Sequence, residues 1–127
     1  MSHDRLPPSA QTQAYLDEIA ALAGSFPEAW EDHPWGDTVF KVKTKVFVFM
    51  GGDPDGYGIS VKLPTTSKIA LQRPGASPTG YGLGKAGWVS LKFAPDEEPP
   101  IDLVRAWLDE SYRAVAPKKL VKTLPPV

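Results

Sequence analysis

The sequence contains no cysteine, which excludes disulfides, thiolate nucleophiles and cysteine-based zinc sites and fits a reducing compartment. Histidine is scarce as well, because His3 and His33 are the only two, so we expect neither a metal site nor another cofactor. The longest strongly apolar stretch, residues 46–50, is far too short to span a membrane. The first residues show no apolar run behind a basic one, so we predict no signal peptide and a cytoplasmic protein that does not contact a membrane.

An excess of charge of either sign is also lacking, since the formal net charge is −1. The charges are nevertheless placed unevenly: residues 1–37 hold seven acids and one base, whereas residues 38–92 hold eight bases and two acids. Such a split orients an anionic partner even when the total charge is close to zero. The alternative interpretation is that the wet face of an antiparallel sheet uses lysine, which also protects sheet edges.

The length of 127 residues suits one domain. We expect a flexible leader over residues 1–11, the domain over residues 12–121 and a tail over residues 122–127. The expected order of elements is a helix, three strands, a short helix, a strand and a long helix. Because the alternation of βαβ units is missing, we predict an α+β fold with an antiparallel sheet, against which an N-terminal helix, a short middle helix and a long C-terminal helix pack.

Hydrophobic periodicity and turn residues give the positions of these elements. The helices are predicted over 12–23, from Thr65 or Thr66 to 71, and from the acidic, proline-containing run 96–100 to Pro117; the strands are predicted over 38–43, 46–50, 58–63 and 88–93. Residues 25–37, with two prolines, and the glycine-rich segment, residues 75–87, are predicted to be irregular. Trp30 and Trp35 are expected to lie over the core, because large rings rarely stay in water.

Four parts of the sequence carry a family resemblance when they are taken together. They are residues 31–36 running into 38–42, residues 60–63, residues 79–89, and residues 109–112 with 116–120. Their order and spacing resemble the MmcQ/YjbR-like family over about residues 12–121. The resemblance implies a compact α+β domain with a double-wing, DNA-binding-like shape, and it implies no reaction. Many members have a histidine or similar residue before an Asn-Lys or Gly-Lys pair, whereas residues 81–85 here read Tyr-Gly-Leu-Gly-Lys.

The glycine-rich segment does not match a phosphate-binding P-loop. Three residues rather than four separate Gly80 from Gly84, and Ala86 stands where that motif needs serine or threonine. The glycines are expected to let the chain turn sharply or cross closely over the sheet. The functional alternative is that exposed amides near Lys85 bind an anion.

No catalytic constellation is visible, and we expect no enzymatic activity. His33 follows two carboxylates, but neighbouring residues seldom converge on a metal, and no nucleophile accompanies the histidine. We expect His33 to hydrogen-bond a backbone group beside Trp35. Trp35 and Trp88 are expected to pack in the core, with stacking on a nucleic-acid base as the alternative. Tyr112 is expected between helix and sheet, with its hydroxyl bonded to a polar group.

The last bases of the chain allow two interpretations. Lys118 and Lys119 follow the predicted last helix, where cations complement the helix dipole. With Arg113 and Lys122 they also form a run of four bases uninterrupted by an acid, which is enough for a few phosphate contacts.

The function implied by the resemblance and by the basic middle of the chain is a DNA-binding module of low sequence specificity. The expected phosphate contacts are Lys41, Lys43, Lys62, Lys85, Arg113, Lys118 and Lys119, and the structural requirement is a continuous positive face. Further candidate contacts are His33, Trp35, Tyr81 and Trp88. The alternatives are a protein-interaction, chaperone-like adaptor and a domain that binds an anion or small molecule around the glycine-rich segment. The chain is expected to be a monomer or a weak dimer.

Overall fold

The computed structural model describes residues 6–34 and 37–126. Its helices are α1 (Ala10–Gly24), α2 (Ser67–Ala70), the 3-10 helix η2 (Leu83–Ala86), α3 (Ile101–Val115) and α4 (Lys118–Val121). Its strands are β1 (Ala29–Asp32), β2 (Thr38–Val42), β3 (Lys45–Asp53), β4 (Gly56–Lys62), β5 (Ala76–Pro78) and β6 (Trp88–Phe93).

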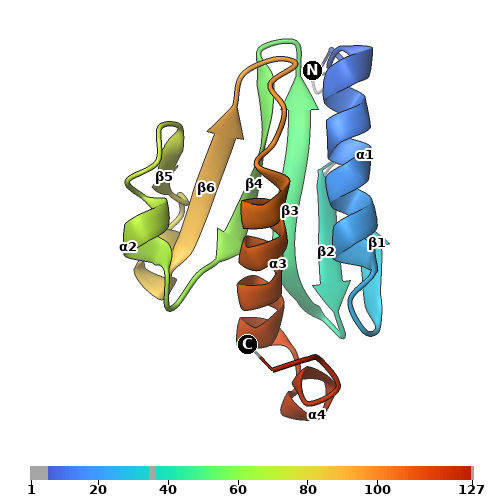
Figure 1. Cartoon of the computed structure of the whole chain (residues 1–127), viewed down its shortest axis with the longest axis vertical. Helices are drawn as coiled ribbons and strands as arrows, with labels where there is room; N and C mark the ends of the chain where they lie inside the picture. The colour runs from blue at the N-terminus through green and yellow to red at the C-terminus, as the bar shows by residue number, and fades with distance from the viewer. Residues whose placement is uncertain (1–5, 35–36, 127) are drawn as a thin grey trace.

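The six strands pair antiparallel in one sheet of order β1-β2-β3-β4-β6-β5. Helices α1 and α3 lie on one face of this sheet and contact each other (Figure 1). The opposite face, turned away from α1 and α3, is called the open face below. The predicted α+β class, with an antiparallel sheet and helices near both ends of the chain, is confirmed.

The core fills the space between the sheet and the two long helices. On α1, Ile19 and Ala23 are four residues apart and lie on the same side of the helix, completely buried. On α3, Val104, Leu108 and Tyr112 repeat this spacing and are completely buried as well. Full burial of a large apolar side chain contributes about 1.5–3 kcal/mol. Packing of these two stripes, more than intrinsic helix propensity, therefore holds both helices on the sheet.

A buried hydroxyl on α3 completes the ladder between β3 and β4. The paired residues of these strands end at Val48 and Val61, so that Phe47 and Lys62 come next. The Ser111 hydroxyl donates a hydrogen bond to the carbonyl of Phe47 (2.5 Å) and accepts one from the backbone N–H of Lys62 (2.8 Å). Ser111 thus satisfies both backbone groups and fixes α3 where Lys62 ends its strand.

Tyr112 follows directly and confirms the position predicted for it. Its ring packs edge-on against Phe47 and stacks on Phe26, with centroid distances of 5.3 and 4.9 Å. Its hydroxyl donates a hydrogen bond of 2.7 Å to the carbonyl of Pro27. Burial raises the pKa of the Tyr112 hydroxyl above its ordinary value.

The prediction that residues 25–37 are irregular throughout is wrong, because Ala29–Asp32 form the edge strand β1. Pro27 and Pro34 lie outside this strand, one on either side. Glu28 takes a positive φ of 57° at the turn into it. The two prolines therefore delimit a short edge strand rather than exclude one.

The glycine-rich segment also contains regular structure that was not predicted, namely β5 and η2. Because β5 is an edge strand of three residues, it tolerates Pro78 and is too short to show alternation. Gly82 and Gly87 flank η2 with positive φ angles of 79° and 91°, which glycine adopts without strain.

The predicted start of α2 is confirmed, whereas that of α3 differs. Thr66 stands at the N-cap position of α2, but its hydroxyl donates to Glu110 of α3 instead of capping the helix. Helix α3 begins at Ile101, after the acidic run rather than within it. In that run, Asp96 accepts hydrogen bonds from the hydroxyls of Ser9 and Thr12. These bonds join the start of α1 to the segment between β6 and α3.

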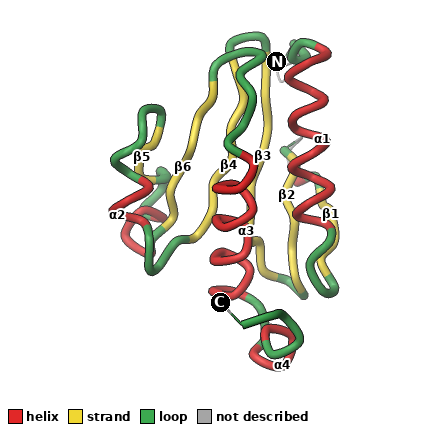
Figure 2. The backbone as a smooth tube through the Cα atoms, viewed as in Figure 1, coloured by secondary structure: helices red, strands yellow, loops and turns green. Residues whose placement is uncertain are grey.

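The strands and long helices run along the long axis of the molecule, so that different chain segments meet at its two ends. The β3–β4 turn, the β6–α3 connection and the start of α1 lie at the upper end in Figure 2. The β2–β3 turn and helix α4 lie at the opposite end, whereas β4 ends above them, nearer the middle of the long axis. These regions are called the upper end and the lower end below.

Candidate nucleic-acid interface

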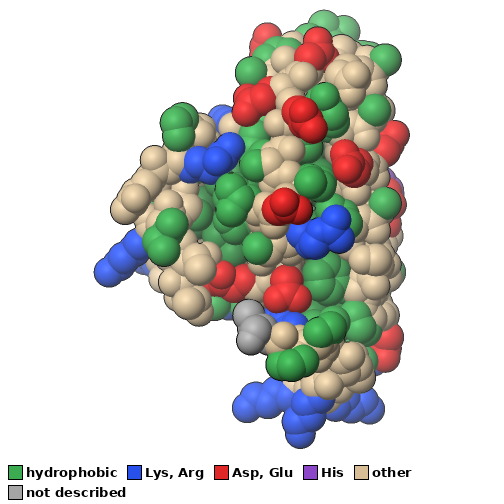
Figure 3. Space-filling view, in the orientation of Figure 1, with side chains coloured by type: hydrophobic (Ala, Val, Ile, Leu, Met, Phe, Trp, Pro, Cys, Tyr) green, Lys and Arg blue, Asp and Glu red, His purple; other side chains and the backbone are tan. Residues whose placement is uncertain are grey.

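The two ends of the molecule carry opposite charge. The upper end holds Asp53 and Asp55 in the β3–β4 turn and the acidic residues 96–98 between β6 and α3. The lower end holds five lysines from the β2–β3 turn and the last helix, namely Lys43, Lys45, Lys118, Lys119 and Lys122, and Lys62 stands above them where β4 ends. Figure 3 shows basic side chains gathered at this end. The field of the folded chain therefore guides an anion toward the lower end.

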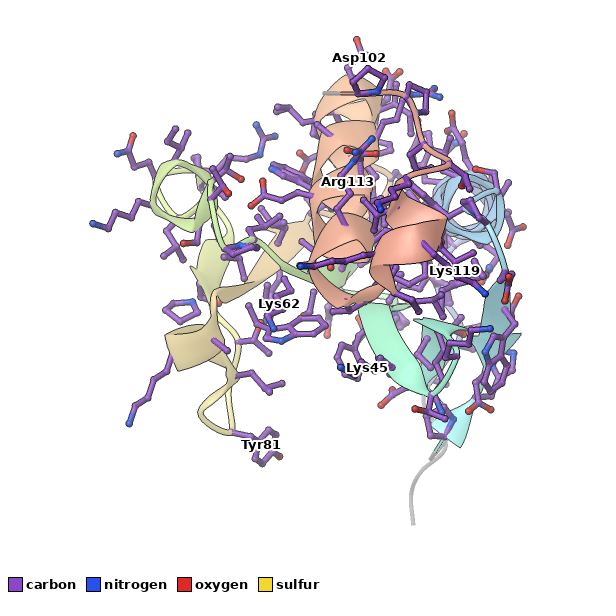
Figure 4. The ribbon with its side chains drawn as sticks, turned by 90° about the horizontal axis from the view of Figure 1, so that it is seen from below. Lys45, Lys62, Tyr81, Asp102, Arg113 and Lys119 are labelled. Atoms are coloured by element: carbon purple, nitrogen blue, oxygen red, sulfur yellow. The ribbon has the colours of Figure 1, made fainter. Side chains whose placement is uncertain are left out.

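Most of these lysines form no ion pair with a described residue, although the charge of Lys119 is close enough to Glu28 to help lower the pKa of that carboxyl. Within residues 6–34 and 37–126, no ion pair involves Lys45, Lys62, Lys118, Lys119 or Lys122. Leu120 is buried and anchors α4 to the core, while the lysines around it are exposed. Figure 4, which views this end from below, shows Lys45, Lys62 and Lys119 on three different elements. These five ammonium groups are available for phosphate oxygens.

Three of the seven predicted phosphate contacts are instead held in ion pairs. The pairs are Lys41 with Asp32 (2.7 Å), Lys43 with Glu28 (2.8 Å) and Arg113 with Asp109 (2.8 Å). The hydrogen bond from Lys41, followed by that from the His33 backbone N–H, lowers the pKa of Asp32. The hydrogen bond and the charge of Lys43 lower the pKa of Glu28 in the same way. The predicted set therefore does not form one continuous positive face, and it divides into paired and unpaired bases.

Lys85 lies apart from the lysines of the lower end, on η2 in the glycine-rich segment. Its side chain is exposed and has no ion-pair partner among the residues that the structure describes. Of the nearby glycines, Gly84 is needed for close packing, because an added Cβ would lie 2.8 Å from Pro78. A Cβ added to Gly80 or Gly82 would meet nothing within 4 Å. The prediction of close chain crossing therefore applies to only part of this segment.

Tyr81 stands between Gly80 and Gly82, at which an added Cβ would meet no other atom. Its side chain is fully exposed, with a relative accessibility of 105%. The residue has a positive φ of 59°, a conformation that costs non-glycine residues energy. In Figure 4 it projects on the side of the sheet away from Arg113 and Asp102 of α3, and therefore on the side of the open face.

A row of three serines crosses the open face and begins beside Phe49. Phe49 pairs with Ser60, Ser60 with Ser90, and Ser90 with Ser77, in register across four strands. The hydroxyls of Ser60 and Ser90 are 2.7 Å apart, and that of Thr79 is 3.0 Å from Ser90. Thr79 thereby ties the glycine-rich segment to the middle of the open face.

Trp88 is buried, as expected, but its partner lies on the open face rather than between sheet and helices. It packs edge-on against Phe49, with ring centroids 5.5 Å apart, and is 8% exposed. Lys62 is its cross-strand neighbour. Phe49 and Trp88 form an apolar floor in the sheet, next to an unpaired lysine.

The prediction that Trp30 lies over the core is wrong. Trp30 is 44% exposed on the edge strand β1, and its indole N–H donates to the carbonyl of Lys43. The ammonium group of Lys41 lies 5.2 Å from the centre of its ring, a cation–π contact that accounts for the position of this large side chain outside the core. Trp35 lies outside the described residues.

His33 bonds to side chains rather than to a backbone group. Its Nε2 lies 2.8 Å from a carboxylate oxygen of Glu31, and its Nδ1 lies 3.4 Å from the hydroxyl of Thr38. In the described ranges, no group of three or more His, Asp or Glu side chains is placed to hold a metal ion. Over the same ranges, no helix combines the length and the apolar character that crossing a bilayer requires.

Two hollows lie near these residues. The larger, about 630 Å³, is a trough on the open face, floored by Phe49, Ser60 and Ser90 and bordered by Lys92. Asp53 and Asp55 make its upper rim acidic, and Asp37 lines it as well. The smaller, about 460 Å³, lies between α1 and β2 and is lined by Asp17, Glu31 and His33 among others. Lys85 borders neither of them.

Sequence reasoning missed several members of the interface. Lys45 was not among the candidates because it lies in a short polar break between two predicted strands. Phe49, Ser60 and Ser90 appeared as ordinary strand residues, and only the cross-strand register places them together on the open face. Alternation against the buried residues of the same strands is the signal that would have identified them.

The chain is similar to known proteins in sequence and in structure. A sequence model described as YjbR matches residues 24–114. Among solved structures, the chain is similar to the crystal structure of the Deinococcus radiodurans protein DR2400, which has a DUF419 domain. The two are 26% identical with a TM-score of 0.66, over 87% of this chain and 88% of the other. No curated protein sequence matches the chain.

Proposed function

This chain belongs to the YjbR family, and from its fold and charge distribution we propose that it is a nucleic-acid-binding module of low sequence specificity. The observation that carries the proposal is a set of five lysines that form no ion pair with any described residue, four of them at the lower end and Lys62 above it at the end of β4. They come from β3, β4, α4 and the residue that follows it, segments far apart in sequence. Contacts between lysine and phosphate depend on charge rather than on base identity, so this arrangement favours binding without sequence preference.

The opposite charge of the upper end supports the same proposal. A protein of net charge near zero attracts a polyanion only when its charges are separated. The carboxylates at 53, 55 and 96–98 lie at the far end of the long axis, where they orient the lower end toward the ligand without competing for its phosphates. At physiological ionic strength the Debye length is about 8 Å, so the upper end affects orientation more than affinity.

Charge removal at the lower end tests the proposal. The double variant Lys118→Ala/Lys119→Ala removes two exposed lysines and leaves the buried anchor Leu120 in place. Fluorescence anisotropy with a labelled oligonucleotide of about 20 nucleotides should show several-fold weaker binding at about 50 mM salt. The matched control, Lys68→Ala/Arg105→Ala, removes two exposed charges from α2 and α3. Equal losses in both variants, or no binding by the unaltered protein, would contradict the proposal.

The two other functions considered have less support. Exposed large apolar side chains include Trp30 on β1, Ile69 on α2, Tyr81 before η2 and Leu103 on α3, which spreads them over separate elements. A protein-interaction module would favour a single continuous apolar patch. A small-molecule site around the glycine-rich segment would need a hollow that includes Lys85, and neither hollow described above does.

A further inference from the structure

Tyr81 has no role inside the folded chain. Its ring is fully exposed and, in the described part of the chain, takes part in no aromatic contact or hydrogen bond. The backbone around it is open, because a Cβ at Gly80 or Gly82 would meet nothing within 4 Å. Packing within the fold therefore does not explain why a large ring stands here between two of the smallest residues.

The rest of the glycine-rich segment is held firmly, so that Tyr81 is presented from a fixed base. The backbone N–H of Thr79 donates to the carbonyl of Trp88 (3.1 Å), and its hydroxyl bonds to Ser90 of the open face. On the other side of Tyr81, Gly84 donates to the carbonyl of Thr79 (3.0 Å) and closes the loop. The ring thus projects from the margin of the open face (Figure 4).

Next to Tyr81, the lower half of the open face combines the two features that bind single strands. It offers a phosphate contact at Lys62, and Lys85 lies nearby in sequence on η2, four residues after Tyr81; neither lysine forms an ion pair with a carboxylate of the described chain. It also offers the hydroxyls of Ser60 and Ser90 as hydrogen-bonding groups on a flat floor. Aromatic rings beside a cationic track bind single strands, since every base has a face on which a ring can stack.

The carboxylates on this face leave the lower half open to an anion. Asp32 is neutralised by Lys41 at 2.7 Å. Asp53 and Asp55 stand at the upper rim of the trough, and Asp37, which also lines it, precedes the upper start of β2. A polyanion on the open face is therefore directed across its lower half, between the glycine-rich segment and the lysines of the lower end.

We infer that the open face binds single-stranded nucleic acid in preference to duplex, with Tyr81 stacking on an unpaired base. The inference rests on the proposed function and names its substrate class. In a duplex the base faces are covered by neighbouring base pairs, so a duplex offers Tyr81 only its backbone or groove edges. A single strand offers base faces to Tyr81 and phosphates to Lys62 and Lys85 together.

The experiment compares Tyr81→Ala, Tyr81→Trp and wild type with an oligo-dT probe of about 20 nucleotides and with a duplex of equal length, at low salt. Loss of the ring should weaken single-strand binding by about 5- to 150-fold, and tryptophan should restore it. Duplex binding should change by less than about twofold, because only phosphate contacts remain there. Ile69→Ala removes an exposed apolar side chain from α2 and is the matched control.

The outcomes separate this inference from the proposed function. The stacking role would be overturned if Tyr81→Ala bound oligo-dT as tightly as wild type while Lys118→Ala/Lys119→Ala lost affinity. That result would leave the basic interface standing. Absence of binding by wild type to either probe would overturn both. Because Tyr81 is fully exposed, the alanine variant should keep the wild-type circular dichroism spectrum and the wild-type unfolding midpoint.

Discussion

Replacement of Ser111 by alanine tests how the sheet and α3 are joined beneath the interface. Ser111 is completely buried, and its hydroxyl stands between the carbonyl of Phe47 and the N–H of Lys62. Alanine removes both hydrogen bonds and leaves one buried donor and one buried acceptor without this partner. An unsatisfied buried group costs about 1–3 kcal/mol. Because Phe47 and Lys62 follow the last pair of the β3–β4 ladder, a small shift would let them bond directly and recover part of this loss.

We therefore expect Ser111→Ala to lower the free energy of unfolding by about 2 kcal/mol. At this chain length, that corresponds to a fall in Tm of about 6–10 °C. Urea unfolding followed by circular dichroism measures the change, and the slope m should stay unchanged because the fold is retained. Ser77→Ala is the matched control, since Ser77 is exposed on β5 and should change stability by less than about 0.5 kcal/mol. A loss from Ser111→Ala no larger than this would refute the bridging role of the hydroxyl.

Three further predictions concern other parts of the fold. Tyr112→Phe keeps the ring packing but removes the hydrogen bond to Pro27, so urea unfolding should show a loss of about 1 kcal/mol; a gain in stability would contradict this. Asp32→Asn/Glu28→Gln frees Lys41 and Lys43, so anisotropy should show tighter oligonucleotide binding, with a salt slope steeper by up to about 1.4 on a single strand; an unchanged slope would mean that the ion pairs do not compete with phosphate. The folded-state pKa values of Asp32 and Glu28 lie below their ordinary values of 3.8 and 4.5. The contribution of these carboxylates to stability is therefore present above the ordinary values and is lost as the pH falls through the lowered pKa values. Urea midpoints between pH 6 and 3 should fall more for wild type than for the double variant, and parallel curves would contradict the assignment.

The sequence was sufficient to predict α1, α2, α3 and the central strands, but not the short helices η2 and α4. The spacing of apolar residues in α1 and α3, and the β-branched and aromatic runs of β3, β4 and β6, reflect burial against one common core. Local pattern and global fold agree in these segments, so periodicity identifies them. Tyr112 was placed correctly for the same reason, because a large amphipathic side chain on the buried stripe of a helix needs a polar partner nearby.

The edge strands and the charge pairing could not be predicted in this way. Strands β1 and β5 are only four and three residues long, and their pairing depends on neighbours that are distant in sequence. The same holds for Lys41 and Lys43, whose partners Asp32 and Glu28 belong to the acidic N-terminal part of the chain. The sequence does not show that these charges are neutralised, because the acidic and basic parts of the chain are far apart along it. The antiparallel pairing of β1 with β2 brings the two parts together.

The salt dependence of oligonucleotide binding tests the central claim most directly, because it counts the phosphates that Lys62 and the unpaired lysines of the lower end contact. With five lysines in contact, the slope of log affinity against log salt on a single strand should be about −3.5, and Lys118→Ala/Lys119→Ala should reduce its magnitude by about 1.4. A wild-type slope near zero, or the same slope in the double variant, would contradict the account.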